Sequence, residues 1–144
     1  LHVAATCVGQ AIRLITEMTE YASKREQFGK RIGEFGQIAA MLADSRAEMA
    51  AGRALCLDCA KQFDAGDQIP FIDIASAKLF CSEMVSRVAD RAVQVMGGLG
   101  YMEDLSDVPR LFRDVRLFRI FEGASQVQQG NIARSMMKDN KSLS

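Results

Sequence analysis

The chain has 144 residues, of which 49% are hydrophobic and 25% charged, and its 18 basic and 18 acidic side chains give a formal net charge of zero. This size and composition are typical of one globular domain with a buried core. The charge balance provides no basic surface for nucleic acid or an anionic membrane. No run approaches the roughly 18–20 apolar residues that span a bilayer. We therefore expect one soluble domain over residues 1–144, without nucleic-acid partners or transmembrane segments.

The N-terminus, Leu1–Ala5, lacks the basic region of a signal peptide and begins within a helical pattern. We therefore expect that the chain was cut from a longer protein.

The four cysteines are Cys7, Cys56, Cys59 and Cys81, and the middle two form a C-x-x-C. A zinc site needs a second pair of ligands, whereas His2 is the only histidine. A redox C-x-x-C opens a helix after a strand, whereas this one lies inside a long helical pattern. The sequence predicts no metal site, and reduced cysteines that pack as small hydrophobic residues in a reducing compartment.

Apolar residues recur at spacings of three and four in three long segments, which predicts three amphipathic helices. The first ends near Lys24-Arg25, and its stripe is Val3-Ala4, Cys7-Val8, Ala11-Ile12, Ile15, Met18 and Ala22. The second runs from about Glu34 to Asp64, and its expected buried side is Phe35, Ile38, Leu42, Met49, Leu55, Cys59 and Phe63. The third has Pro70 in its first turn, and its stripe is Ile74, Ala77, Phe80-Cys81, Met84-Val85, Val88, Ala92 and Met96.

The remaining segments are less regular. Gly97-Gly98 breaks the third helix, and a short helical piece begins at Pro109. Ser125 followed by Gln128 predicts a capping box that opens a last helix, ending near Lys138. No alternating strand pattern occurs, so the predicted fold is an all-α, up-and-down four-helix bundle.

The glycines at 97–100 contain a G-x-G but follow a helix rather than a strand, so the dinucleotide-fold interpretation fails. They either end the helix or let a ligand approach the backbone closely.

Glu122 lies between Phe121 and Gly123, just before the last helix. An apolar neighbour favours the protonated carboxyl, and a glycine admits a substrate, so the pattern suits a general base. The alternative is a solvated loop glutamate.

Four arginines recur every third residue upstream of Glu122: Arg110, Arg113, Arg116 and Arg119. They form either an ion-paired helix face, with Asp107 and Asp114 as partners, or a site for phosphates.

Several short motifs follow one another in a fixed order: Arg25-Glu26-Gln27-Phe28-Gly29, Ala43-Asp44, Gln94-Val95-Met96-Gly97-Gly98-Leu99-Gly100-Tyr101, Arg113-Asp114 and Phe121-Glu122-Gly123-Ala124-Ser125-Gln126. As a set, they resemble the C-terminal helical domain of the acyl-CoA dehydrogenases over essentially the whole chain. The resemblance implies a four-helix bundle that follows a helical and a β domain in a larger FAD enzyme. These enzymes oxidise acyl-CoA to trans-2-enoyl-CoA in fatty acid β-oxidation and pass electrons to electron-transferring flavoprotein.

The resemblance also assigns roles to residues. Glu122 matches the base that removes the α-proton, with Gly123 beside the thioester and Arg134 near the CoA moiety. Residues that match FAD-contacting positions are Arg25, Gln27, Phe28, Gln94, Gly97, Gly98, Ala124 and Gln126. The first six of these match positions that reach the FAD of a neighbouring subunit, which implies a homo-oligomer, a dimer or tetramer.

The chain also departs from the family pattern. Ala124 replaces the usual threonine, so one hydroxyl contact to the flavin is missing, and Gly36 and Ala39 replace glutamines found in many members. Acyl-CoA oxidase and a non-catalytic oligomerisation bundle are the alternative functions. The resemblance implies the bacterial cytoplasm or the mitochondrial matrix, and an isolated domain that is inactive.

Overall fold

The computed structural model describes residues 1–66 and 71–139, and this part of the chain consists of helices, the turns that connect them and one minimal hairpin. In order, the elements are α1 (His2–Lys24), β1 (Glu26–Gln27), β2 (Lys30–Arg31), the 3-10 helix η1 (Ile32–Glu34), α2 (Gly36–Asp64), α3 (Phe71–Met96), α4 (Gly98–Tyr101), α5 (Val108–Arg116), the 3-10 helix η2 (Leu117–Arg119) and α6 (Ser125–Asp139). Pro70 lies outside the described residues.

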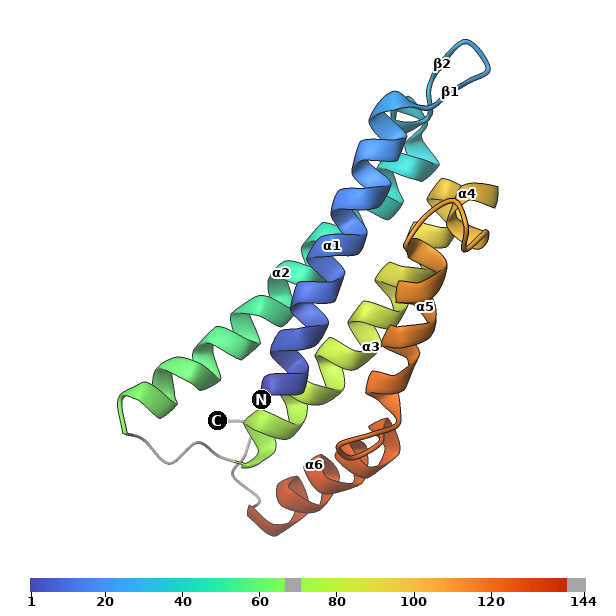
Figure 1. Ribbon diagram of the computed structural model, residues 1–144. Coiled ribbons are helices and arrows are strands. Elements are labelled where there is room, and N and C mark those ends of the chain that lie inside the picture. Colours follow the sequence, from blue (N-terminus) through green and yellow to red (C-terminus); the bar gives the residue numbers. More distant parts are fainter. Residues whose placement is uncertain (67–70, 140–144) are drawn as a thin grey trace.

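Three long helices, α1, α2 and α3, run alongside one another with alternating direction (Figure 1). The fourth position of the bundle is shared: α5 packs along α3 and α1, whereas α6 lies across the end where α3 begins (Figure 1). The predicted all-α bundle is confirmed, and its last helix is divided by the segment that contains Glu122.

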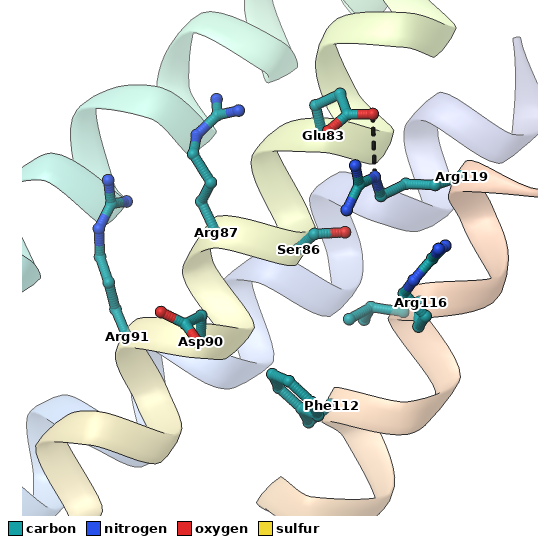
Figure 2. Close-up of a pocket in the computed structure, with 9 residues that line it drawn as sticks. Glu83, Ser86, Arg87, Asp90, Arg91, Phe112, Arg116 and Arg119 are labelled. Carbon is teal, nitrogen blue, oxygen red and sulfur yellow. Dashed lines mark hydrogen bonds and ion pairs between the residues drawn. The ribbon is translucent and has the colours of Figure 1, made fainter. Parts of the chain in front are cut away.

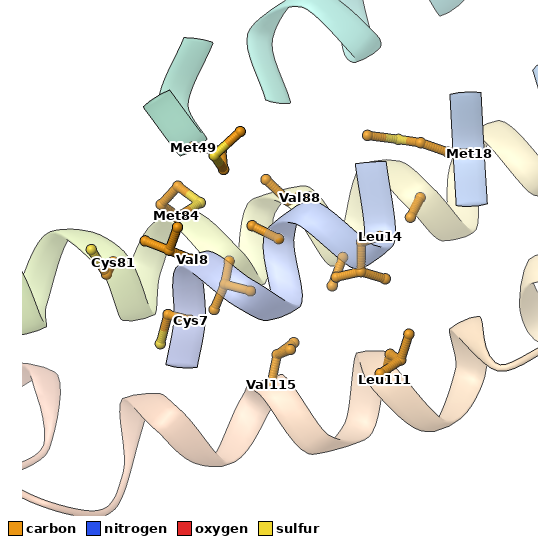
Figure 3. Packing of buried hydrophobic residues seen from close by; sticks show 14 of the residues in the cluster. Cys7, Val8, Leu14, Met18, Met49, Cys81, Met84, Val88, Leu111 and Val115 are labelled. Atoms are coloured by element: carbon orange, nitrogen blue, oxygen red, sulfur yellow. The ribbon is translucent and has the colours of Figure 1, made fainter. Parts of the chain in front are cut away.

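The core lies where α1, α3 and α5 meet, with α2 closing the other side of α3 (Figure 3). The α1 stripe predicted from the sequence is mostly buried, but Ile12 is 44% exposed and Leu14, absent from that prediction, is fully buried. Truncating a buried leucine to alanine costs about 2–5 kcal/mol, so Leu14 is a principal source of stability. All four cysteines are free and buried, as predicted.

The buried side of α2 differs from the prediction, because Leu55 is 39% exposed and Phe63 is 71% exposed. Small residues face α3 instead: a side chain added at Gly52 would meet Cys81 Sγ at 3.1 Å and Met84 Cε at 3.3 Å. The two helices therefore approach closely, and the larger residues of α2 are turned outward.

Some element boundaries also differ from the sequence prediction. The second helix starts at Gly36, after a hairpin whose strands are too short to show alternation. The predicted capping box is wrong: Ser125 Oγ donates to Glu83, and Gln128 Nε2 donates to the carbonyls of Glu122 and Gly123. Among the helices described, none combines the length and apolar character needed to cross a membrane.

Candidate functional site

The turn that contains Glu122 connects η2 to the first turn of α6. Glu122 and Gly123 both adopt left-handed backbone conformations, with φ of 53° and 83°. That conformation costs a residue with a Cβ roughly 1–2 kcal/mol. Surrounding contacts must therefore hold Glu122 in place.

Two side chains hold the backbone of this turn. Lys78 Nζ, from α3, donates hydrogen bonds to the carbonyls of Phe118 at 2.8 Å and Gly123 at 2.6 Å. Gln128 Nε2, from α6, donates to the carbonyls of Glu122 at 3.3 Å and Gly123 at 3.4 Å. Lys78 is only 5% exposed, and this burial lowers its pKa, although the nearby carboxylates of Glu83 and Glu122 oppose the shift.

Glu83, also on α3, anchors side chains on either side of the turn. Its Oε1 accepts hydrogen bonds from Arg119 Nε at 2.9 Å and from Ser125 Oγ at 2.6 Å (Figure 2 shows the Arg119 bond). Burial raises the pKa of Glu83, but these two donors outweigh it and hold the pKa below its ordinary value. Glu83 is therefore an ionised anchor at neutral pH.

A small cavity of about 120 Å³ lies beside Glu122, between the start of α1 and the first turns of α3. Its wall is apolar at Val3, Phe71 and Ile74 and polar at Lys78. The Glu122 residue itself is exposed, and its neighbour Phe121 stacks on Phe118 with ring centroids 5.7 Å apart. The turn therefore places a carboxylate at the edge of a cavity with both apolar and polar walls.

A second cavity, of about 400 Å³, lies at the opposite end of the bundle. It brings together five residues singled out in the sequence, which come from the β1–β2 hairpin and the end of α3: Arg25, Gln27, Phe28, Gly97 and Gly98. Phe28, at the hairpin tip, has a left-handed φ of 53° and is 94% exposed. An aromatic ring so exposed, next to an arginine, is suited to a partner or ligand.

The two cavities lie at opposite ends of the bundle, separated by the length of α1, whose 23 residues span about 35 Å (Figure 1). Gln94 is exposed on the last turn of α3, near the hairpin end. Ala124 and Gln126 lie beside Glu122 at the start of α6. Arg134 is exposed further along α6, where its Nη1 donates to Asn131 Oδ1 at 3.4 Å.

Comparison with known proteins identifies the family. The family model of the acyl-CoA dehydrogenase C-terminal domain matches residues 1–137 of this chain. The chain belongs to the acyl-CoA dehydrogenase family. It is 38% identical to the caffeyl-CoA reductase-Etf complex subunit CarC of Acetobacterium woodii over 138 residues, which are 96% of this chain and 36% of that protein.

Solved structures agree with this acyl-CoA dehydrogenase assignment. Butyryl-CoA dehydrogenase from Megasphaera elsdenii matches 94% of this chain with 35% of its own, at a TM-score of 0.88 and 35% identity. The FAD complex of PigA matches 93% of this chain with 34% of its own, at a TM-score of 0.87 and 30% identity. The chain thus spans about a third of the length of the relatives it matches.

The arginine row of this acyl-CoA dehydrogenase domain is largely ion-paired within the described residues. Arg110 pairs with Asp107 and Asp114, as in the ion-paired alternative, at 3.3 and 3.6 Å, but Arg113 pairs with Glu103 instead. Arg116 and Arg119 line a groove of about 460 Å³ between α3 and α5 (Figure 2). The pairs of Arg110 and Arg113 are more than half exposed and contribute little to stability.

Sequence reasoning did not find Lys78 and Glu83, the two residues that hold the Glu122 turn. Lys78 carried a signal: it is four residues after Ile74 and three before Cys81, on the buried stripe of α3. A charge on an apolar stripe needs a buried partner. Glu83 is half-buried and carried no comparable signal. No three His, Cys, Asp or Glu side chains gather as a metal site within residues 1–66 and 71–139.

Proposed function

We propose that this domain supplies the catalytic base and part of the FAD and acyl-CoA sites of an acyl-CoA dehydrogenase that forms trans-2-enoyl-CoA. The observation that supports this most strongly is the left-handed Glu122-Gly123 turn, which α3 and α6 hold by its backbone carbonyls. A carboxylate held in this way, with a glycine next to it, is suited to remove a proton from a substrate that approaches the turn.

In this proposal, the Glu122 carboxylate takes the proton from the α-carbon of the thioester. Gly123 has no side chain, so the thioester comes close to the backbone of the turn. Hydrogen bonds that polarise the thioester carbonyl, one of them from the backbone of Glu122, acidify the α-C–H. Bound FAD would accept the β-hydrogen as hydride.

The residues at the hairpin end fit a dinucleotide. Arg25 provides a cation for a pyrophosphate, and a Cβ added at Gly97 or Gly98 would meet no atom within 4 Å, so the backbone there is open. One FAD cannot reach from this end to Glu122, because the length of α1 separates them. We therefore propose that the hairpin end of one copy binds the FAD next to Glu122 of another copy, in a homo-oligomer. Ala124 lacks the hydroxyl that would give a further contact.

The rest of the active site lies outside this chain in our proposal. A cavity of 120 Å³ is well below the roughly 300–1,000 Å³ of a complete ligand pocket. We expect residues 1–144 alone to bind FAD weakly. Electron-transferring flavoprotein is the proposed electron acceptor, which agrees with the relative CarC being a subunit of a caffeyl-CoA reductase-Etf complex.

The test uses the full flavoenzyme that carries this domain, mixed with acyl-CoA in the absence of oxygen. We expect the oxidised flavin absorbance to disappear and one trans-2-enoyl-CoA to form per flavin. Reoxidation by electron-transferring flavoprotein rather than by oxygen would identify a dehydrogenase rather than an oxidase. A flavin that stays oxidised with every acyl-CoA tried would contradict the proposal.

A further inference from the structure

Lys78 is a buried charge on a helix face that otherwise packs the core. Its neighbours at helical spacing, Ala75 and Cys81, are buried, and Lys78 itself is 5% exposed. Removing an ammonium from water costs several kcal/mol, and a hydrophobic side chain of the same size would often serve the fold equally well. The position of this lysine therefore calls for a reason beyond stability.

The two acceptors of Lys78 enclose the turn. The carbonyls of Phe118 and Gly123 lie four residues before and one residue after Glu122, and both receive hydrogen bonds from the one ammonium. Hydrogen bonds from a charged donor are about twice as strong as neutral ones. Lys78 therefore fixes both ends of the segment from which the Glu122 side chain projects.

The direction of the Glu122 side chain depends on this restraint. Because Glu122 is in the left-handed conformation, with φ of 53°, its Cα–Cβ bond has a different direction from the one it would have in a right-handed turn. The left-handed conformation is roughly 1–2 kcal/mol less favourable for a residue with a Cβ. Without the restraint at Gly123, the segment can relax and turn the carboxylate away.

We propose that Lys78 is a positioning residue: its ammonium holds the carbonyls of Phe118 and Gly123 so that the Glu122 carboxylate meets the α-carbon of the bound acyl-CoA. This inference rests on the proposed role of Glu122 as the base. Lys78 touches the backbone of the turn and acts on the reaction through Glu122.

A second anchor makes this role separable from folding. Glu83 holds the side chains of Arg119 and Ser125, on either side of the turn, independently of Lys78. With Lys78 replaced by methionine, these bonds keep α6 against α3, whereas the Gly123 carbonyl retains only its long bond from Gln128. We expect Lys78→Met to fold, bind FAD and bind acyl-CoA, but to hold Glu122 loosely.

The experiment compares Lys78→Met with Ser82→Ala in the FAD-loaded full flavoenzyme. Ser82 is a matched control, because it is buried on the same helix and its hydroxyl, among the described residues, bonds only within the helix, to Leu79. A displacement of about 1 Å at a reacting group costs on the order of 10²-fold in rate. We expect Lys78→Met to slow flavin reduction at saturating acyl-CoA by about this factor, with unchanged FAD content and acyl-CoA dissociation constant, and Ser82→Ala to match the unsubstituted enzyme.

Two further readouts separate positioning from a general structural role. Wash-out of α-deuterium from an acyl-CoA without β-hydrogens reports proton removal alone, and Lys78→Met should slow it by the same factor as flavin reduction. In a Glu122→Gln background the base is absent, so Lys78→Met should leave the residual rate unchanged. A further loss in that background would overturn the positioning role.

The other outcomes are also decisive. A Lys78→Met enzyme that reduces its flavin at the normal rate per bound FAD overturns the inference. If Lys78→Met loses FAD, the comparison is repeated with Lys78→Gln, whose side chain keeps amide donors. If Lys78→Gln also loses FAD, Lys78 serves the fold alone. If Glu122→Gln is fully active, the proposed function fails, whereas an inactive Glu122→Gln with an active Lys78→Met refutes only the role of Lys78.

Discussion

The hydrogen bond between Ser125 and Glu83 gives a sharp prediction about how the Glu122 turn is held. Ser125 is 2% exposed and its Oγ lies 2.6 Å from Glu83 Oε1. A hydrogen bond to a charged group contributes about 1.5–3 kcal/mol. Arg119 still donates to the same oxygen, so Ser125→Ala does not leave the carboxylate without a partner. We expect Ser125→Ala to lower the free energy of unfolding by about 2 kcal/mol.

The effect of Ser125→Ala should depend on pH in a defined direction. Burial raises the pKa of Glu83, but the hydrogen bonds from Ser125 and Arg119 lower it by a larger amount, so its folded-state pKa is below the unfolded value of about 4.3. A depressed carboxyl pKa stabilises the fold above the unfolded pKa, and this contribution is lost as the pH falls through the folded-state pKa. The difference between the original chain and Ser125→Ala should therefore be full near neutral pH and shrink below about pH 4.

Thermal unfolding of residues 1–144, followed by far-ultraviolet circular dichroism, measures this. At about 2–4 °C per kcal/mol, the melting temperature should fall by roughly 4–8 °C near neutral pH. Ser23→Ala is the matched control, because Ser23 is exposed and its hydroxyl, within the part of the chain that the structure describes, bonds only to the Glu20 carbonyl of α1. Equal melting temperatures for the two variants, or a loss that is the same in acid, would refute this account of the anchor.

Two further predictions concern the turn and the core. In Gly123→Ala, the added Cβ lies against Gln128 Nε2, and the residue has a left-handed φ that disfavours a side chain, so flavin reduction should slow in the full enzyme. Gly9→Ala is the control, because a Cβ added there meets no atom within 4 Å and should not slow the reaction. An unchanged rate in Gly123→Ala would show that the turn tolerates displacement. Burial raises the pKa of Cys7 to about 12, whereas the hydrogen bond shared with Cys81 lowers the pKa of Cys56. Maleimide should therefore label Cys56 before Cys7 in the native chain. The reverse order by mass spectrometry would contradict this packing.

The sequence predicted the fold well where burial follows a helical period. The stripes of α1 and α3 are continuous and long, so their faces could be identified without a structure. The face of α2 could not, because small residues such as Gly52 pack against α3 and leave Leu55 and Phe63 outside. Periodicity of large apolar residues identifies the wrong face when helices approach closely.

The candidate site was predicted in part, from the order of short motifs rather than from helical periodicity. Motif order singled out Glu122, Arg25 and Gly97 as candidates, and the structure places the last two at one cavity. The contacts that hold Glu122 come from Lys78 and Glu83, about 40 residues earlier in the chain. The position of Lys78 on the buried stripe indicates that it needs a partner, but no local pattern says which distant segment supplies it. The Ser125-x-x-Gln128 spacing suggested a capping box, although both side chains have other partners.

The central claim is that Glu122 removes the α-proton, and Glu122→Gln in the full flavoenzyme tests it most directly. Glutamine keeps the size of the side chain but cannot accept the proton. Stopped-flow measurement of flavin reduction by saturating acyl-CoA should show a rate lower by about 10²–10⁴-fold, the usual contribution of a general base, with FAD content unchanged. Flavin reduction at a near-normal rate would contradict the assignment of Glu122 as the base.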